Sequence, residues 1–151
     1  MNKIYRKTTT INAEQFDGSN EMAKRYGAEL YSNSGYGYDA VEGEPDGDGY
    51  VLITLEGELL IRTGDWIATG INGEHWPIAN DVFKKTYAEL PVIPKYVADY
   101  IDMLKNNSDV INASIGAIEY GWGSVKLTTW LNENGDTFAR AWLDGYQIEE
   151  D

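Results

Sequence analysis

Five carboxylates stand within ten residues of this sequence, and tyrosines flank them on both sides. The acids are Asp39, Glu42, Glu44, Asp46 and Asp48, and the nearest tyrosines are Tyr36, Tyr38 and Tyr50. Acids interleaved with aromatic rings can mimic the phosphates and bases of a nucleic acid, and they can steer association with a groove rich in Arg and Lys. The segment therefore predicts a partner-binding loop. A loop whose acids only keep it solvated is the alternative.

Part of the same segment matches a calcium-binding loop, but the match is incomplete. Glu44, Asp46 and Asp48 occupy the first, third and fifth positions of the motif, and Gly49 occupies the sixth. The twelfth position, where calcium loops carry a bidentate acid, falls on Leu55. Transition-metal ligands are scarce as well, because the chain has one His and no Cys. We therefore predict no metal site and no cofactor.

Nucleophilic catalysis of the Ser-His-Asp type would need His75 as its base, because the chain has no other His. The sequence contains neither a nucleophile elbow nor a Gly cluster for an oxyanion. Asp65, in the run Thr63-Gly64-Asp65, suggests a catalytic acid, but a turn aspartate bonded to nearby backbone is the simpler interpretation. No catalytic residue is predicted. A pair of carboxylates acting in hydrolysis stays open, because an acidic protein contains many close acids.

A pocket for a small molecule is the alternative to a protein partner. Trp66 and Trp76 could line an aromatic pocket, with Asp65 and His75 beside them. Aromatic rings are costly to leave exposed unless they bind something, and the chain has five Trp and eleven Tyr. A nucleotide signal is the ligand that such a pocket would suit. An enzyme of unrecognised type is the third interpretation.

The formal net charge of −13 is the dominant global property of the chain. A field of this sign repels nucleic acids and anionic membranes and attracts basic surfaces, although it also serves solubility alone. The acids are spread over the sequence, with 15 acidic and 8 basic residues through Leu90 and 10 and 4 after it. The absence of Cys suits a reducing compartment, and neither a signal peptide nor a membrane span is recognised. We expect a cytoplasmic protein that binds neither nucleic acid nor membrane directly.

Two prolines mark the boundary between two modules. Pro91 and Pro94 stand three residues apart, and neither can lie inside a helix or a central strand. Strand signals dominate before this point, and helical periodicity dominates after it. We predict an α+β protein in which residues 1–90 form a small antiparallel, β-rich module. Residues 91–151 form a module of short helices.

The elements of the first module follow from short local signals. Strand patterns cover residues 8–16, 29–32 and 66–69, and a hairpin joins residues 50–55 to residues 58–62. Asn72-Gly73 is the strongest hairpin-turn signal in the chain. We expect one helix over residues 21–26, ended by Gly27, and another over residues 82–87, capped by Asn80 or Asp81. Residues 33–49 are predicted to form a long surface loop.

The second module has a helical pattern. A helix is predicted from Pro94 to about Lys105, and a second, capped by Ser108 or Asp109, over residues 110–118. Residues 125–131 are apolar but short, so helix and strand stay open there. A last helix over residues 137–143 is expected to begin at an Asp136 cap and to end at Gly145. Its buried face is formed by Phe138, Ala141 and Trp142.

Two stretches resemble known families. The first stretch comprises TLEG at residues 54–57, GDWI at residues 64–67, Gly70, Gly73-Glu74, Pro77, Phe83 and Tyr87, and it resembles a small uncharacterised family found widely in tailed phages. The second comprises IPKYVAD at residues 93–99 and TFARAWLDGY at residues 137–146, and it resembles an uncharacterised family of phages and prophages of Gram-positive bacteria. Residues 33–49 and 106–124 follow neither pattern.

These resemblances imply a phage or prophage protein outside the virion, expressed in a bacterial cytoplasm. Neither family implies an activity. Together with the charge, they lead to the expectation of a non-enzymatic phage accessory protein. Its partner would be a host protein with a basic nucleic-acid-binding surface, such as a CRISPR effector nuclease, which the acidic loop would block as a nucleic-acid mimic.

Overall fold

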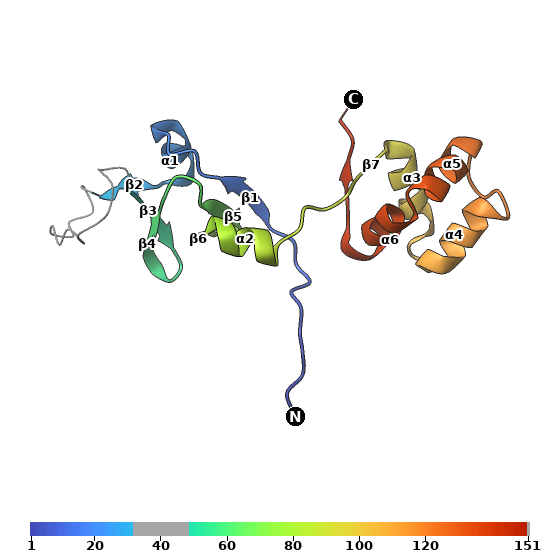
Figure 1. The fold of residues 1–151 in the computed structure, drawn as a ribbon, viewed down its shortest axis with the longest axis horizontal. Coiled ribbons are helices and arrows are strands. Elements are labelled where there is room, and N and C mark those ends of the chain that lie inside the picture. The colour runs from blue at the N-terminus through green and yellow to red at the C-terminus, as the bar shows by residue number, and fades with distance from the viewer. Residues whose placement is uncertain (32–48, 151) are drawn as a thin grey trace. The chain divides into compact units, whose positions relative to one another are not determined.

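The computed structural model describes residues 1–31 and 49–150, which form two compact units (Figure 1). The first unit is Met1–Tyr87 and the second is Ala88–Asp151. Among the described residues, the first unit contains two antiparallel sheets and two short helices, and the second contains four helices and a two-stranded pair. The predicted α+β class is confirmed, with strands concentrated in the N-terminal half and helices in the C-terminal half.

Two three-stranded antiparallel sheets form the framework of the first unit. One has the strand order β1-β5-β6, with bounds Asn12–Gln15, Trp66–Thr69 and His75–Ile78. The other has the order β2-β3-β4, with bounds Glu29–Leu30, Tyr50–Thr54 and Gly57–Ile61. Both predicted hairpins are confirmed, since β3 pairs with β4 and β5 pairs with β6. The strand expected over residues 8–16 is shorter and is limited to β1.

Two short helices belong to this unit. Helix α1 spans Asn20–Tyr26, and Gly27 ends it in a left-handed conformation as predicted. The cap of α2, which spans Asn80–Thr86, was predicted wrongly. Ala79 holds the cap position with no side-chain bond. The Asn80 side chain instead accepts a hydrogen bond from Trp66 Nε1 at 3.0 Å, so a distant indole has taken the oxygen that the local pattern assigned to the helix end.

The core of the first unit lies between α1 and the two sheets. Its largest members, each at most 3% exposed, are Phe16, Met22, Leu52, Ile61 and Ile67. Phe16 packs edge-on against Tyr50, with 5.3 Å between the ring centroids. The Phe16 amide also donates to the carbonyl oxygen of Asp65 at 2.8 Å. The end of β1 is therefore fixed both to the core and to the turn before β5.

The second unit contains four helices of similar length. Helices α3 to α6 span Lys95–Leu104, Val110–Ile118, Val125–Glu133 and Gly135–Asp144. Asp109 caps α4 as predicted, because its carboxylate accepts the amide of Asn112 at 2.8 Å. The segment left open between helix and strand is helical, with Ser124 as its cap. Asp136 is not a cap; it lies in the first turn of α6, which begins after Asn134.

A single core joins these helices. The predicted face of Phe138, Ala141 and Trp142 is confirmed as buried. Polar groups join the helices as well. The Tyr100 hydroxyl donates to the carbonyl of Ala113 at 2.7 Å. Lys105 Nζ donates to the carbonyl of Trp142 at 2.6 Å, near the C-terminus of α6 where a cation is favourable.

A parallel strand pair, which the sequence analysis did not predict, closes the second unit. Strand β7 (Val92–Ile93) pairs with β8 (Gln147–Ile148), so the segment before α3 lies beside the segment after α6. The intervening Tyr146 donates its hydroxyl to Asp102 Oδ1 of α3 at 2.8 Å. The C-terminal segment is therefore held by backbone pairing and by one side chain.

The Tyr146 phenol should lose its proton at a higher pH than an ordinary tyrosine. Burial, the hydrogen bond to Asp102 and the nearby carboxylates raise the pKa of Tyr146 to about 12. The pKa in the unfolded chain is about 10, so the stabilising contribution is complete below that pH and is lost as the pH rises through the folded value. Following tyrosinate absorbance against pH, we expect Tyr146→Phe to remove one residue from the most alkaline part of the titration. Tyr120→Phe, which changes an exposed ring, is the matched control variant.

Candidate functional site

The predicted partner-binding loop lies outside the described residues. This applies to every member of the predicted set: Tyr36, Tyr38, Asp39, Glu42, Glu44, Asp46 and Asp48. The partial calcium pattern falls on the same segment. Within the described residues 1–31 and 49–150, no group of three or more His, Asp or Glu is arranged to hold a metal ion.

Asp65 is placed in the turn between β4 and β5. Its Oδ2 accepts a hydrogen bond from the Arg62 amide at 3.0 Å, and its own amide donates to the Arg62 carbonyl at 3.0 Å. Both hydrogen bonds join residues within the turn, which is typical of an aspartate that stabilises a turn. The carboxylate therefore positions backbone in this structure.

The other three residues of the alternative ligand pocket lie on two faces of one sheet. Trp76 is the cross-strand neighbour of Ala68, which follows Trp66 by two residues, so both indoles share a face. His75 pairs with Thr69 and lies on the opposite face with Ile67. The structure therefore brings Trp66 and Trp76 to the same side and separates His75 from them.

Trp66 belongs to a ladder of three rings. It stacks on Phe83 of α2 with 4.1 Å between centroids and 11° between planes, and Phe83 stacks on Tyr87 at 5.1 Å. The indole N–H is bonded to Asn80. These contacts fasten α2 to the sheet. Packing of these rings is enough to explain why Trp66, Phe83 and Tyr87 are aromatic.

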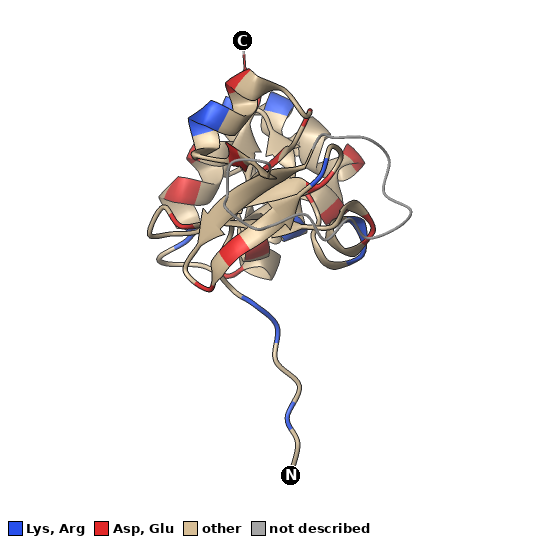
Figure 2. Cartoon of the chain, turned by 90° about the vertical axis from the view of Figure 1, so that its left-hand side faces the viewer, with Lys and Arg blue, Asp and Glu red and all other residues tan. Residues whose placement is uncertain are grey.

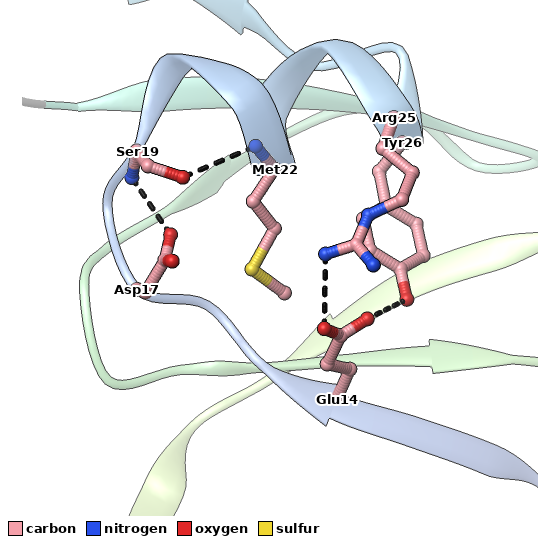
Figure 3. Close-up of polar contacts among 6 residues, drawn as sticks. All are labelled: Glu14, Asp17, Ser19, Met22, Arg25 and Tyr26. Carbon is pink, nitrogen blue, oxygen red and sulfur yellow. Dashed lines mark hydrogen bonds and ion pairs between the residues drawn. The ribbon is translucent and has the colours of Figure 1, made fainter.

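His75 contacts Tyr26, a member of a polar cluster that joins α1 to β1. Figure 3 shows this cluster, which consists of Glu14, Arg25 and Tyr26. The His75 ring packs edge-on against Tyr26 at 5.1 Å, and its Nδ1 lies 2.9 Å from the Thr69 hydroxyl. The Tyr26 hydroxyl donates to one oxygen of Glu14 at 2.7 Å, and Arg25 donates to the other at 2.9 Å. Burial and the bond to Glu14 raise the pKa of the Tyr26 phenol.

Figure 3 also shows the cap of α1, where a second carboxylate acts on backbone. Ser19 Oγ accepts the Met22 amide at 3.1 Å, and Asp17 accepts the Ser19 amide at 2.8 Å. Hydrogen bonds from the side chain and from the backbone amide of Ser19 lower the pKa of the Asp17 carboxyl. The carboxylates of Glu14 and Asp17 thus both bind residues of α1 or of its N-terminal cap, and they stabilise the position of this helix.

The described acidic side chains are at the surface. No charged residue is buried in the part of the chain that the structure describes. Asp and Glu are found on helices and strands alike (Figure 2). Ion pairs hold Glu14, Asp81 and Asp99 at 2.9, 3.8 and 2.8 Å from their partners. Surface pairs of this kind leave the net field almost unchanged at a distance, because the chain has 25 acidic and 12 basic residues.

Sequence reasoning missed the exposed apolar side of α4. Ile111, Ile115 and Ile118 are 67%, 37% and 44% exposed, whereas Ala113 and Ala117 on the other side are fully buried. The sequence shows that seven of the nine residues of VINASIGAI are nonpolar, more than one buried side of a helix can hold, but it does not show which side stays exposed.

Trp122 provides a second exposed apolar feature in the same unit. Its indole covers Gly116 of α4, where an added Cβ would come within 2.0 Å of the ring. The ring is nevertheless 53% exposed. It forms one wall of an open groove whose lining is otherwise mainly polar: Leu104, Asn106, Asn107, Ser108, Asp109 and Asn112.

Fold and surface together define a two-unit α+β protein with an acidic exterior. None of the helices in residues 1–31 and 49–150 is long and apolar enough to cross a membrane. Residues 88–151, which are the second unit, match the model of a protein family of unknown function, DUF1642. The predicted similarity of the C-terminal module to an uncharacterised family is thereby confirmed. No curated protein and no solved structure matches the chain.

Proposed function

We propose that the chain is a non-enzymatic binding protein whose target is a protein with a basic, nucleic-acid-binding surface. The observation that carries this proposal is the exterior charge. All described carboxylates are at least partly exposed, and the chain as a whole carries −13. A field of that strength accelerates encounters with cationic surfaces and suppresses encounters with anionic ones.

The described candidates for chemistry support binding over turnover. Asp65 closes a turn, Glu14 anchors two side chains of α1, and Trp66 is stacked within a ring ladder. His75 is placed across the sheet from both tryptophans. Each residue has a structural partner that accounts for its position, so none of them requires a substrate to explain it.

The finer form of the proposal concerns the biological setting. The resemblance of residues 54–87, 93–99 and 137–146 to phage families favours a phage accessory protein in a bacterial cytoplasm. Its target would then be a host antiphage complex such as a CRISPR effector nuclease. The acids from Asp39 to Asp48 would occupy the channel that normally holds DNA or RNA.

Affinity capture from a Gram-positive host lysate at two salt concentrations tests the proposal. At low salt the immobilised chain should retain a nucleic-acid-binding protein. Added duplex DNA should release this protein, because the DNA and the chain compete for the same basic surface. High salt should release it, since the attraction is screened. A matched variant with Glu42, Glu44, Asp46 and Asp48 changed to their amides should retain less. Capture that DNA does not compete with, or no capture of such a protein, would contradict the proposal.

A further inference from the structure

Helix α4 has an apolar side that its own unit leaves uncovered. Its core-facing residues are Ala113, Gly116 and Ala117. At 100° per residue, Ile111, Ile115 and Ile118 fall within one narrow stripe that points away from them. Their exposures of 67%, 37% and 44% agree with that placement. Figure 1 shows α4 at the edge of the helical unit.

The spacing of the three isoleucines is that of a helix-packing seam. They recur at four and then three residues, as residues do where one helix packs along another. From Ile111 to Ile118 the stripe is about 10 Å long, enough to contact about two turns of a partner helix. Scattered exposed apolar residues are ordinary, but three β-branched residues aligned on one short helix form a contact surface.

Charge decides between the possible occupants of this stripe. Asp109 and Glu119 stand at the two ends of α4, and residues 106–125 contain no Lys or Arg. The C-terminal unit has 11 acidic and 4 basic residues. A second copy would bring acids against acids, whether it docked parallel or antiparallel. A helix with basic residues beside its apolar seam would instead be attracted by Glu119 and by the excess of acids in the unit.

We propose that the outer side of α4 binds an amphipathic helix of a partner protein, with basic residues flanking the apolar seam of that helix. The inference rests on the proposed function and assigns it a surface. The isoleucines supply the apolar contact, and Glu119 together with the acidic excess of the unit selects a cationic partner and rejects an anionic one.

A synthetic heptad peptide of leucine and lysine is the probe for this surface. Titrated into the isotope-labelled chain, it should shift the backbone amide signals of α4 more than those of α5. Changing Ile111 and Ile115 to serine keeps every charge and should weaken binding at least about tenfold, because two apolar contacts are lost. Leu143→Ser, which changes a 66% exposed residue of α6, is the matched control and should bind as the unaltered chain does.

Several results would overturn this inference. Equal binding by the double serine variant, or by a scrambled peptide of the same composition, would show attraction by charge alone. Equal binding of a leucine–glutamate peptide would refute the charge selection. Concentration-dependent dimerisation that the serine changes abolish would assign the stripe to a second copy. If the serine variant still captures the lysate partner, the surface is wrong while the proposed function stands. If the peptide binds α4 but no basic partner is captured, the proposed function fails by itself.

Discussion

Truncation of Phe138 to alanine is expected to unfold the C-terminal unit while the N-terminal unit stays folded. Phe138 is 1% exposed and lies between Tyr100 and Trp142, with ring centroids 6.4 and 6.0 Å away. Removing a buried phenylalanine costs about 3–5 kcal/mol. A unit of this length has a free energy of unfolding of about 3–10 kcal/mol. The loss therefore removes about a third of this stability at the upper end of the range and all of it at the lower end.

The N-terminal unit should be unaffected because the two cores have no residue in common. His75 offers a specific reporter, since it is the only His in the chain and its ring packs against Tyr26 within the first unit. In proton NMR the His75 ring signals should keep their folded positions in Phe138→Ala. The amide signals of α3 to α6 should collapse toward unfolded positions.

Phe138→Leu is the control for this experiment, because it keeps a large apolar side chain and should cost less stability. A matched truncation in the other core, Leu52→Ala, should reverse the pattern, since Leu52 is fully buried in the first unit. If the His75 signals move to unfolded positions in Phe138→Ala, the two units depend on each other for folding and the expectation is refuted.

Elements whose signals are local were predicted well from the sequence. The turn at Asn72-Gly73 connects β5 to β6, and Asp109 caps α4 within three residues of the amide that it accepts. Gly27 ends α1 because it can adopt a left-handed conformation. Each of these features depends on residues that are only a few positions apart. The interactions that determine it can therefore be recognised in a short stretch of sequence.

The errors have a non-local cause or concern competing local partners. The Asn80 side chain is bonded to the indole of Trp66, 14 positions away, and a sequence window around residue 80 cannot contain that competitor. At the start of α6, the Asn134 side chain donates to the carbonyl of Trp130 at 2.9 Å, and its own carbonyl accepts the Phe138 amide. Helix α6 therefore begins before Asp136, almost directly after α5.

The parallel pair and the candidate surface lay beyond sequence reasoning for different reasons. Strands β7 and β8 have two residues each, which is too short for an alternating pattern to be recognised. Their paired residues, Val92 with Gln147 and Ile93 with Ile148, are 55 positions apart in the sequence and meet only in the fold. The exposed side of α4 could be identified only once it was known which side of the helix packs into the core. Only the burial of Ala113 and Ala117 fixes that choice.

Replacing Gly145 with alanine is expected to destabilise the C-terminal unit by about 1–3 kcal/mol. Gly145 ends α6 with φ of 102° and ψ of 176°, a region that only glycine occupies readily. Crowding is not the cause, because an added Cβ would approach no heavy atom closer than Leu90 Cδ1 at 3.8 Å. The cost arises from the backbone conformation itself.

The same backbone conformation determines the direction in which the chain continues after α6. Immediately after Gly145, Tyr146 donates to Asp102 and residues 147–148 pair with β7. An alanine that relaxes toward ordinary backbone angles would redirect both contacts. The variant should therefore lose the late component of the tyrosine titration as well as stability, whereas a variant that only softened α6 would keep that component.

Gly135→Ala is the matched control for Gly145→Ala, because both variants have the same composition. Gly135 is the first residue of α6, has no left-handed backbone angle, and would place its Cβ in open space. Alanine is favoured over glycine in a helix, so this change should raise the free energy of unfolding by up to about 1 kcal/mol. Chemical denaturation of the two variants should thus shift in opposite directions. Equal shifts would mean that the angles of Gly145 carry no cost, and the account of how α6 ends would be wrong.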